Sequence, residues 1–358
     1  MAVENSTIVL EALYRQDFIS QKQIVDGSGL KPSTVSNIIR ELKAAGIIRE
    51  GGVLDGGGVG AKQMSLQIDP AFAWVASWQI DLKGNQLCLL NAAGHTMAVE
   101  KYPPDLGWKS IVGDIHQRIE ALAAQKRLSM KRFAGLGICV QGIVDQDRGE
   151  VICSQPHGMS SVPLGEIVSE KLGSVVHVER NIPCGAYLEQ HVAPAHRKGS
   201  FLYYLLRRHE SFFEHGIGIV LDGKVFRGSH SAAGELHERL FPRPPLETLR
   251  TEANWNDLYC NFGQSVGMLA DFLDVDGVIV SSDDPGLTVK RFEAFENAIE
   301  SHLRPIEHRK IWVARSQVGP EGMVVGAGLA VLHRYFRELA AALPNRSVPS
   351  RGDQLSVR

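Results

Sequence analysis

The stretch PSTVSNIIRELKAAG, residues 32–46, is the clearest structural signal in this 358-residue chain. Its apolar residues recur at three- and four-residue spacing, which predicts a helix with one buried face. These residues are Val35, Ile38, Ile39, Leu42 and Ala45. Pro32 suits the first turn of a helix, and Gly46 suits the position just after the last turn. The stretch therefore predicts a helix over residues 32–45 whose other face is polar.

The polar face of this helix carries side chains that can bind DNA. Hydroxyl, amide and guanidinium groups hydrogen-bond to base edges and to phosphates. The candidate DNA-contacting residues in and beside the helix are Lys31, Ser33, Thr34, Ser36, Asn37, Arg40 and Lys43.

Two shorter helices are predicted before this one. Residues 6–14 form the first, and Ser20 is the expected N-cap of the second, which covers residues 21–26 and stops at the Gly-Ser-Gly of residues 27–29. Two short helices joined by a glycine-containing turn are typical of a helix-turn-helix, whose second helix enters the major groove of DNA.

A hairpin is expected after the third helix. Residues 47–50 and 64–68 are predicted strands, separated by a glycine-rich segment, and together they form a wing. Arg49 and Lys62 of this wing are expected to contact the DNA backbone or minor groove. The alternative interpretation is a small helical domain whose surface hairpin mediates protein contacts.

Composition sets limits on the rest of the chain. A hydrophobic content of 44% over 358 residues predicts a small domain joined to a larger, two-lobed one. The formal net charge of −2 excludes a polycationic nucleic-acid binder, so any DNA binding must come from local placement of charge. The five cysteines form no CxxC pair, which argues against a disulfide framework or a zinc ribbon. We expect a cytoplasmic protein with no membrane partner.

From Trp74 onward, apolar runs rich in β-branched residues alternate with helical patterns, which predicts an α/β fold. Five short segments then occur in a specific order: residues 137–145, 162–164, 178–181, 221–228 and 233–235. Together they resemble the ROK family of sugar kinases and their repressor relatives. The resemblance implies a two-lobed actin-like (ribonuclease H-like) sugar-kinase fold behind the winged helix, with a ligand cleft between the lobes.

The resemblance also implies a domain organisation. We expect a winged helix-turn-helix over residues 1–70, a first α/β lobe over 71–190 and a second, dimerising α/β lobe over 191–318. Residues 319–343 are expected to form a C-terminal helix that packs back on the first lobe, and residues 344–358 a disordered tail.

The chain departs from the family's kinase motifs. Residues 81–85 keep one of the two glycines of the first phosphate loop, residues 212–214 replace a Gly-Thr-Gly with Phe-Phe-Glu, and residues 281–282 replace a Gly-Gly with Ser-Ser. Asn181 stands where the family has its catalytic aspartate, and an amide is not basic enough to accept a hydroxyl proton. At the family's zinc site, Glu238 stands at the histidine position and the cysteine cluster is absent. We therefore expect no kinase activity, no metal and no cofactor.

Position by position, the resemblance places the family's sugar-binding groups on Arg180, Asn181, Glu235, Glu238 and Glu247. Carboxylates and amides can orient sugar hydroxyls without chemistry. Arg180 favours an anionic ligand such as a sugar acid, unless it pairs with Glu179 or Glu235.

The sequence thus predicts a DNA-binding transcriptional regulator, expected to be a repressor. Its partners would be a double-stranded DNA operator, a sugar or sugar-acid effector, and further copies of itself in a homodimer or homotetramer. Two alternatives stay open: an active sugar kinase with a fused regulatory domain, and a DNA-binding dimer that no ligand affects.

Overall fold

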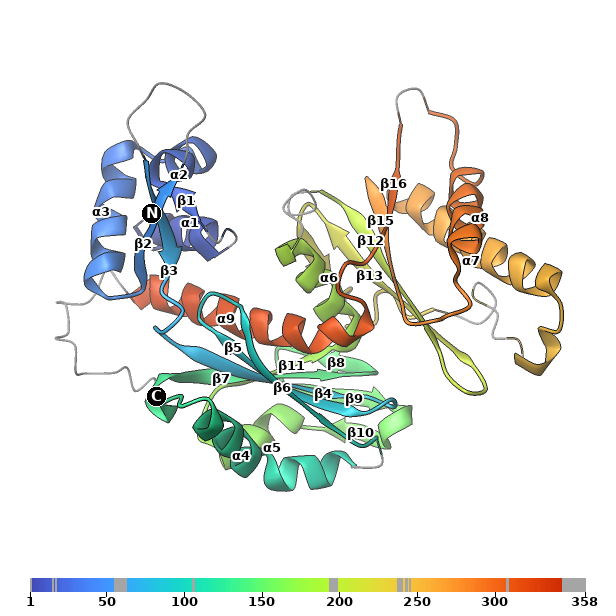
Figure 1. Ribbon diagram of the computed structural model, residues 1–358, viewed down its shortest axis with the longest axis horizontal. Helices are drawn as coiled ribbons and strands as arrows, with labels where there is room; N and C mark the ends of the chain where they lie inside the picture. Colours follow the sequence, from blue (N-terminus) through green and yellow to red (C-terminus); the bar gives the residue numbers. More distant parts are fainter. Residues whose placement is uncertain are drawn as a thin grey trace. The chain divides into compact units, whose positions relative to one another are not determined.

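The computed structural model describes residues 2–14, 16, 18–54, 63–104, 107–192, 199–236, 241, 244, 246–306 and 309–342. The chain divides into two compact units, each of which is discontinuous in sequence (Figure 1). Unit 1 comprises residues 1–138, 163–178 and 327–358, and unit 2 comprises residues 139–162 and 179–326. The domain boundaries expected from the sequence stay a prediction.

The N-terminal part of unit 1 is a winged helix. Its elements are α1 (Ala2–Tyr14), β1 (Ile19–Ser20), α2 (Gln21–Ser28), α3 (Pro32–Ala44), β2 (Ile48–Leu54) and β3 (Gln63–Ile68). The predicted N-cap is confirmed: Ser20 Oγ accepts from the Gln23 amide at 3.2 Å, and Gln23 Oε1 accepts from the Ser20 amide at 2.8 Å. Strands β1, β3 and β2 form an antiparallel sheet in that order, and β1 is an element that the sequence did not predict.

The apolar face of α3 builds the core of the winged helix. Val35, Ile38, Ile39 and Leu42 are all buried, as the spacing predicted. Ala45, which the same spacing placed on this face, is exposed just beyond the end of the helix. The helix ends at Ala44, one residue earlier than expected, and Gly46 follows in the left-handed region with φ of 70°.

A five-stranded sheet in the order β11-β7-β4-β5-β6 forms the first lobe. Its strands are β4 (Trp74–Ile80), β5 (Asn85–Asn91), β6 (Thr96–Tyr102), β7 (Phe133–Val140) and β11 (Val176–Arg180). The helices α4 (Trp108–Gln125) and α5 (Leu164–Leu172) lie on one face, and α9 (Met323–Ala342) lies on the other (Figure 1).

Two glycines let α9 and the sheet approach closely. A Cβ atom at Gly137 of β7 would lie 2.4 Å from the backbone oxygen of Ala327, and one at Gly328 would lie 2.5 Å from the Leu90 side chain. Real Cβ contacts are not this short. The Ala327 oxygen is part of the backbone, so the position of Gly137 requires glycine, whereas the Leu90 methyl group facing Gly328 belongs to a flexible side chain that can shift. The C-terminal helix is therefore seated on the sheet by backbone contact.

Unit 2 contains a second five-stranded sheet, in the order β14-β13-β12-β15-β16. Its elements are α6 (Asn181–Val192), β12 (Phe201–Arg208), β13 (Phe213–Leu221), β14 (Lys224–Phe226), α7 (Glu252–Leu273), β15 (Gly277–Ser282), α8 (Val289–Glu300) and β16 (Trp312–Arg315). A small antiparallel sheet of β8 (Ile143–Asp145), β9 (Glu150–Ser154) and β10 (Met159–Val162) belongs to the same unit. Among the described residues, the short helices of unit 2 are η2 (Gln155–His157), η4 (Leu246–Thr248) and η5 (Pro320–Gly322), and unit 1 contains η1 (Met130–Arg132).

The central strand β12 is buried on both faces. Tyr203 lies against Gly185 of α6, whereas Tyr204 stacks on Phe295 of α8 with ring centroids 5.7 Å apart. This alternation is that of a strand covered by helices on both sides. The side chains of residues 201–206 are all buried in the core.

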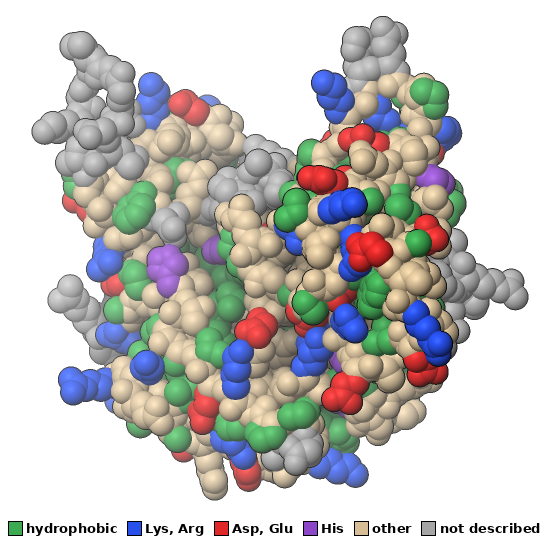
Figure 2. Space-filling model, turned by 45° about the vertical axis from the view of Figure 1, so that its right-hand side comes forward, with side chains coloured by type: hydrophobic (Ala, Val, Ile, Leu, Met, Phe, Trp, Pro, Cys, Tyr) green, Lys and Arg blue, Asp and Glu red, His purple; other side chains and the backbone are tan. Residues whose placement is uncertain are grey.

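The surface is mixed in charge. Figure 2 shows Lys and Arg interspersed with Asp and Glu on the visible face, in keeping with the formal net charge of −2. Within the described part of the chain, no helix has the length and apolar character needed to cross a membrane. The cysteines are free thiols, and burial raises the pKa of Cys88 to about 11.

Substituting Gly137 tests the contact between α9 and the sheet. We expect Gly137→Ala to destabilise the protein by about 1–3 kcal/mol, because the added methyl group meets the Ala327 carbonyl. Urea unfolding followed by circular dichroism measures this change. Gly113→Ala on α4 is the matched control, since nothing lies within 4 Å of its Cβ position, and it should stabilise by about 0.5–1 kcal/mol. Equal effects of the two substitutions would contradict the close approach.

Candidate functional site

The exposed face of α3 presents a polar stripe. Ser33, Ser36, Asn37 and Arg40 recur at three- and four-residue spacing and are all exposed, opposite the buried apolar face. We call these four residues the α3 stripe. Thr34 is half-buried beside the stripe, and Lys31 is exposed at the N-cap position. Most of the side chains predicted for this helix therefore face solvent together.

The other predicted cations lie beside partners. Lys43 Nζ forms an ion pair with Glu50 Oε1 at 2.6 Å, which ties the end of α3 to strand β2. Arg49 lies across the sheet from Gln67. In the amide orientation that satisfies both residues, the Gln67 oxygen accepts from Arg49 Nε at 2.9 Å. Lys62, which was predicted to contact DNA, lies outside the described residues.

The second cluster of predicted residues lies in unit 2, at the end of β11. The Arg180 side chain is 5% exposed, donates to Glu235 Oε1 at 3.1 Å and donates to the Ala233 carbonyl at 2.8 Å. Glu179 is bound instead by Arg227, whose Nε lies 2.7 Å from Glu179 Oε2. Of the two partners left open by the sequence, the Arg180 guanidinium therefore pairs with Glu235.

A glycine turn positions Glu235. Gly234 has a φ of 84°, and a Cβ atom there would lie 1.7 Å from the Ile217 carbonyl oxygen, so the position requires glycine. The Ile217 amide also donates to the Gly234 carbonyl at 3.2 Å, which fastens the turn to strand β13. Glu235 is 49% exposed and combines a fixed carboxylate with access to solvent.

Asn181 has different neighbours. It is the first residue of α6 and is buried; its Oδ1 accepts from the Ile182 amide at 2.9 Å and its Nδ2 donates to Glu214 Oε1 at 3.4 Å. The side chain of Glu247 is exposed on η4, and Glu238 lies outside the described residues. Arg180 thus pairs with Glu235, another predicted ligand-binding residue, whereas Asn181 pairs with Glu214, which was not predicted to bind a ligand.

Glu214 is the centre of a buried charged network. Its Oε2 lies 3.0 Å from His209 Nε2 and 3.5 Å from Arg207 NH1, and Arg207 Nε donates to Asp283 Oδ2 at 3.3 Å. The side chains of Arg207 and Glu214 are each only 6% exposed. The sequence showed Glu214 only as part of the segment that replaces a Gly-Thr-Gly, and gave no signal for its protein partners.

Beside this network, Tyr259 donates to Asp284. Burial raises the pKa of the Tyr259 hydroxyl well above its usual value, and the nearby Asp284 acts in the same direction. Tyr259 is therefore a neutral hydrogen-bond donor over the whole physiological pH range.

The loop at residues 81–85 is held by hydrogen bonds to its own aspartate. Asp81 is buried, and its carboxylate accepts from the Lys83 amide at 2.8 Å and from Gln79 Nε2 at 3.1 Å. This carboxylate caps its own turn, while the Lys83 side chain is exposed.

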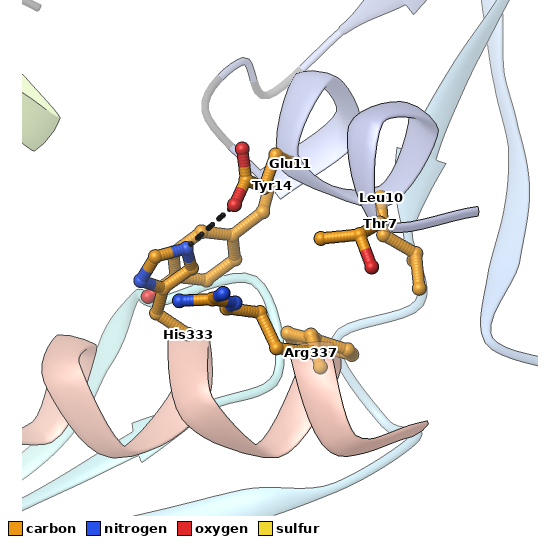
Figure 3. A pocket seen from close by; sticks show the side chains of 7 residues that line it. Thr7, Leu10, Glu11, Tyr14, His333 and Arg337 are labelled. Atoms are coloured by element: carbon orange, nitrogen blue, oxygen red, sulfur yellow. Dashed lines mark hydrogen bonds and ion pairs between the residues drawn. The ribbon is translucent and has the colours of Figure 1, made fainter. Parts of the chain in front are cut away.

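A contact between α1 and α9 joins the winged helix to the rest of unit 1 (Figure 3). The Tyr14 hydroxyl donates to the Leu329 carbonyl at 3.1 Å, and the Tyr14 ring stacks on His333 with an interplanar angle of 7°. Glu11 Oε1 lies 3.2 Å from His333 Nε2, and Phe336 lies 5.6 Å from the Tyr14 ring. We call these five residues the α1–α9 joint. The crevice beside it is too shallow to enclose a water molecule, so it is a joint rather than a ligand pocket.

Fold and site together define a winged-helix protein that carries a sugar-kinase-like domain. Residues 7–49 match the model of a winged helix-turn-helix DNA-binding domain, and residues 81–244 match that of the ROK family. The chain therefore contains a ROK family domain behind an N-terminal winged helix-turn-helix.

Several known proteins are similar in sequence. A xylose repressor from Caldicellulosiruptor bescii is 24% identical over 270 residues, which cover 75% of this chain and 63% of that protein. The DNA-binding transcriptional dual regulator NagC from Escherichia coli is 22% identical over 233 residues, which cover 65% of this chain and 56% of that protein. The chain thus spans about three-fifths of the length of these curated relatives.

Solved structures share the fold. A ROK family transcriptional regulator described as a homologue of the E. coli MLC protein has a TM-score of 0.74 at 16% identity, covering 95% of this chain and 98% of that one. A ROK family glucokinase from Streptomyces griseus, solved with glucose and AMPPNP, has a TM-score of 0.56 at 16% identity, covering 72% of this chain and 98% of that one.

The buried network predicts a large effect of truncating Glu214. Glu214→Ala leaves the buried Arg207 guanidinium without this carboxylate and His209 Nε2 without this partner, so we expect a loss of about 3–5 kcal/mol in the free energy of unfolding. Replacing the pair together, Arg207→Met with Glu214→Leu, should restore part of this loss because neither member of the buried Arg207–Glu214 pair is left facing an apolar replacement of the other. Urea unfolding of the two variants compares them. A loss below 1 kcal/mol for Glu214→Ala would contradict the network.

Proposed function

We propose that this protein is a DNA-binding transcriptional regulator, acting in the cytoplasm as a repressor, whose operator affinity changes when a sugar or sugar-derived ligand binds. The observation that carries the proposal is the α3 stripe, four exposed polar side chains on the second helix of a helix-turn-helix with a wing beside it. The proposal agrees with the names of the relatives, which are a xylose repressor and an N-acetylglucosamine repressor.

A two-fold operator suits this arrangement. A homodimer would place one α3 helix in each of two successive major grooves, and a homotetramer would hold two such pairs. Lys31, with its exposed side chain before the helix, is then placed to contact a phosphate, as is the half-buried Thr34. Lys43 and Arg49 are proposed contacts of the DNA backbone that also hold α3 and the wing in place.

For the ligand, the pairing of Arg180 with Glu235 favours an uncharged sugar. The guanidinium charge is compensated at 3.1 Å, which weakens its attraction for an anionic group. The pair offers both a donor and an acceptor, the combination that sugar hydroxyls bind. Asn181, Glu238 and Glu247 complete the proposed ligand-binding set, and sugar acids rank behind uncharged sugars.

Kinase activity is not part of the proposal. Asn181, at the position of the family's catalytic base, is an amide whose Nδ2 already donates to Glu214. The Asp81 carboxylate accepts from its own loop, and Glu214 is a buried carboxylate held by protein donors. These contacts support a protein that binds a sugar without phosphorylating it.

Coupling between ligand and DNA would pass through helix α9. Its first residues belong to unit 2, and its later residues belong to unit 1, where they form the α1–α9 joint with the winged helix. A ligand that favours one arrangement of the lobes would shift this helix and thereby the spacing of the two α3 helices in a dimer.

Operator binding with and without sugars tests the function. DNA duplexes from the region upstream of the protein's own gene are titrated with the full-length protein at several salt concentrations. Each titration is repeated with xylose, N-acetylglucosamine, glucose, sugar acids or sugar phosphates. We expect specific binding that weakens with salt, and at least a tenfold change in affinity with one uncharged sugar. Glu235→Gln should remove the sugar response and keep DNA affinity, whereas the exposed Glu293→Gln on α8 should keep both. Specific binding that no sugar changes would favour a ligand-independent DNA-binding dimer.

An assay of ATP turnover tests the prediction that the protein does not phosphorylate sugars. We expect no ATP consumption with hexoses or amino sugars, because Asn181 supplies no base and Glu214 disfavours a phosphate. A coupled assay for ADP release measures turnover, and titration calorimetry with ATP measures binding. Sugar-dependent ADP release by the purified protein would instead support an active sugar kinase with a regulatory domain.

A further inference from the structure

The α3 stripe contains one long cationic side chain, Arg40, and it has a side-chain partner on the same helix. Arg40 NH2 donates to Asn37 Oδ1 at 3.1 Å, one turn earlier on the exposed face. We infer that Arg40 determines operator specificity by binding a guanine in the major groove, and that Asn37 is the residue that orients it. This inference rests on the proposed function.

The neighbouring cation on α3 has a different role. Lys43 forms an ion pair with Glu50, so its charge is compensated and its side chain is directed toward strand β2. Arg40, by contrast, is bound by a neutral amide, which leaves its positive charge uncompensated by that contact. Of these two cations, Arg40 is therefore the one equipped to bind an electronegative base edge.

The chemistry of the guanidinium selects the base. Its planar fork of N–H donors matches the two acceptors that guanine presents in the major groove, N7 and O6. The bond to Asn37 occupies one of the five N–H groups, and the remaining donors suffice for a bidentate contact. Adenine presents a donor beside its acceptor, so it cannot accept two such bonds.

Asn37 acts by holding Arg40 in position. An asparagine contacts adenine bidentately through both its oxygen and its amino group. The Asn37 oxygen already accepts from Arg40, so this asparagine is a positioning residue rather than an adenine contact. Because the Arg40 side chain is already held in one conformation, less side-chain conformational entropy is lost when DNA binds.

The small side chains of the stripe allow the approach. Ser33 and Ser36 precede Arg40 on the exposed face, and neither extends as far from the helix axis as an arginine. The N-terminal turns of a recognition helix lie nearest the bases, so short side chains there let the helix enter the groove deeply enough for Arg40 to reach a base edge.

Selection from a library of random-sequence duplexes tests the inference without a known operator. The full-length protein is used at fixed salt, and the selected duplexes are sequenced. We expect half-sites with a guanine at one fixed position. Arg40→Ala should bind the selected duplex roughly 5- to 150-fold more weakly and accept all four bases at that position. Arg40→Lys should keep only part of the preference, because an ammonium group lacks the fork.

Matched variants separate positioning from contact. Asn37→Ala should keep guanine as the preferred base at the same position while reducing the preference. Ser33→Ala and Lys43→Ala should change affinity about equally for all sequences, because neither contacts that base. Circular dichroism melting of each variant confirms folding, which these exposed substitutions should leave unchanged.

Three outcomes overturn the inference. If Arg40→Ala still selects the same guanine, another residue contacts that base. If Asn37→Ala loses an adenine preference at a separate position, Asn37 contacts a base itself rather than positioning Arg40. If the wild-type protein selects no sequence at all, the proposed function fails together with the inference. In the first two outcomes the protein still binds a specific sequence, so only the inference fails.

Discussion

The seating of α9 on the five-stranded sheet is the contact on which unit 1 depends. Gly137 lets the backbone of α9 approach the sheet to a distance that a Cβ atom at this position would not permit. The later turns of the same helix hold α1 through Tyr14 and His333. The winged helix is therefore held to the rest of unit 1 in part by a helix from the far end of the chain.

Charge burial is the second constraint, and it explains how unit 2 can hold ionisable side chains in its interior. A buried carboxylate without donors would destabilise the fold, but Glu214 is bound by Arg207, His209 and Asn181. The polar groups of these four residues therefore bind one another inside the protein. Their arrangement supports folding, whereas Arg180 and Glu235 form a pair whose carboxylate is half exposed and can meet a ligand.

Much of the winged helix could be predicted because its signals are local. The spacing of Val35 to Leu42, the cap at Ser20 and the glycine after α3 each act within a few residues, and all three predictions are confirmed. Strand β1 was missed, since two residues show no periodicity. The order of five short motifs predicted the ROK family domain, because motif order survives where overall identity is low.

The sequence by itself determined the class of each domain and the polar face of α3. Only the tertiary structure decided which charges pair: Glu235 is bound by Arg180, which precedes it by 55 residues, and Tyr14 donates to Leu329, which follows it by 315. Helical periodicity and caps depend on neighbours in the chain and can be recognised in it. The partner of a buried polar group is chosen by proximity in space, where desolvation makes each unmet hydrogen bond costly.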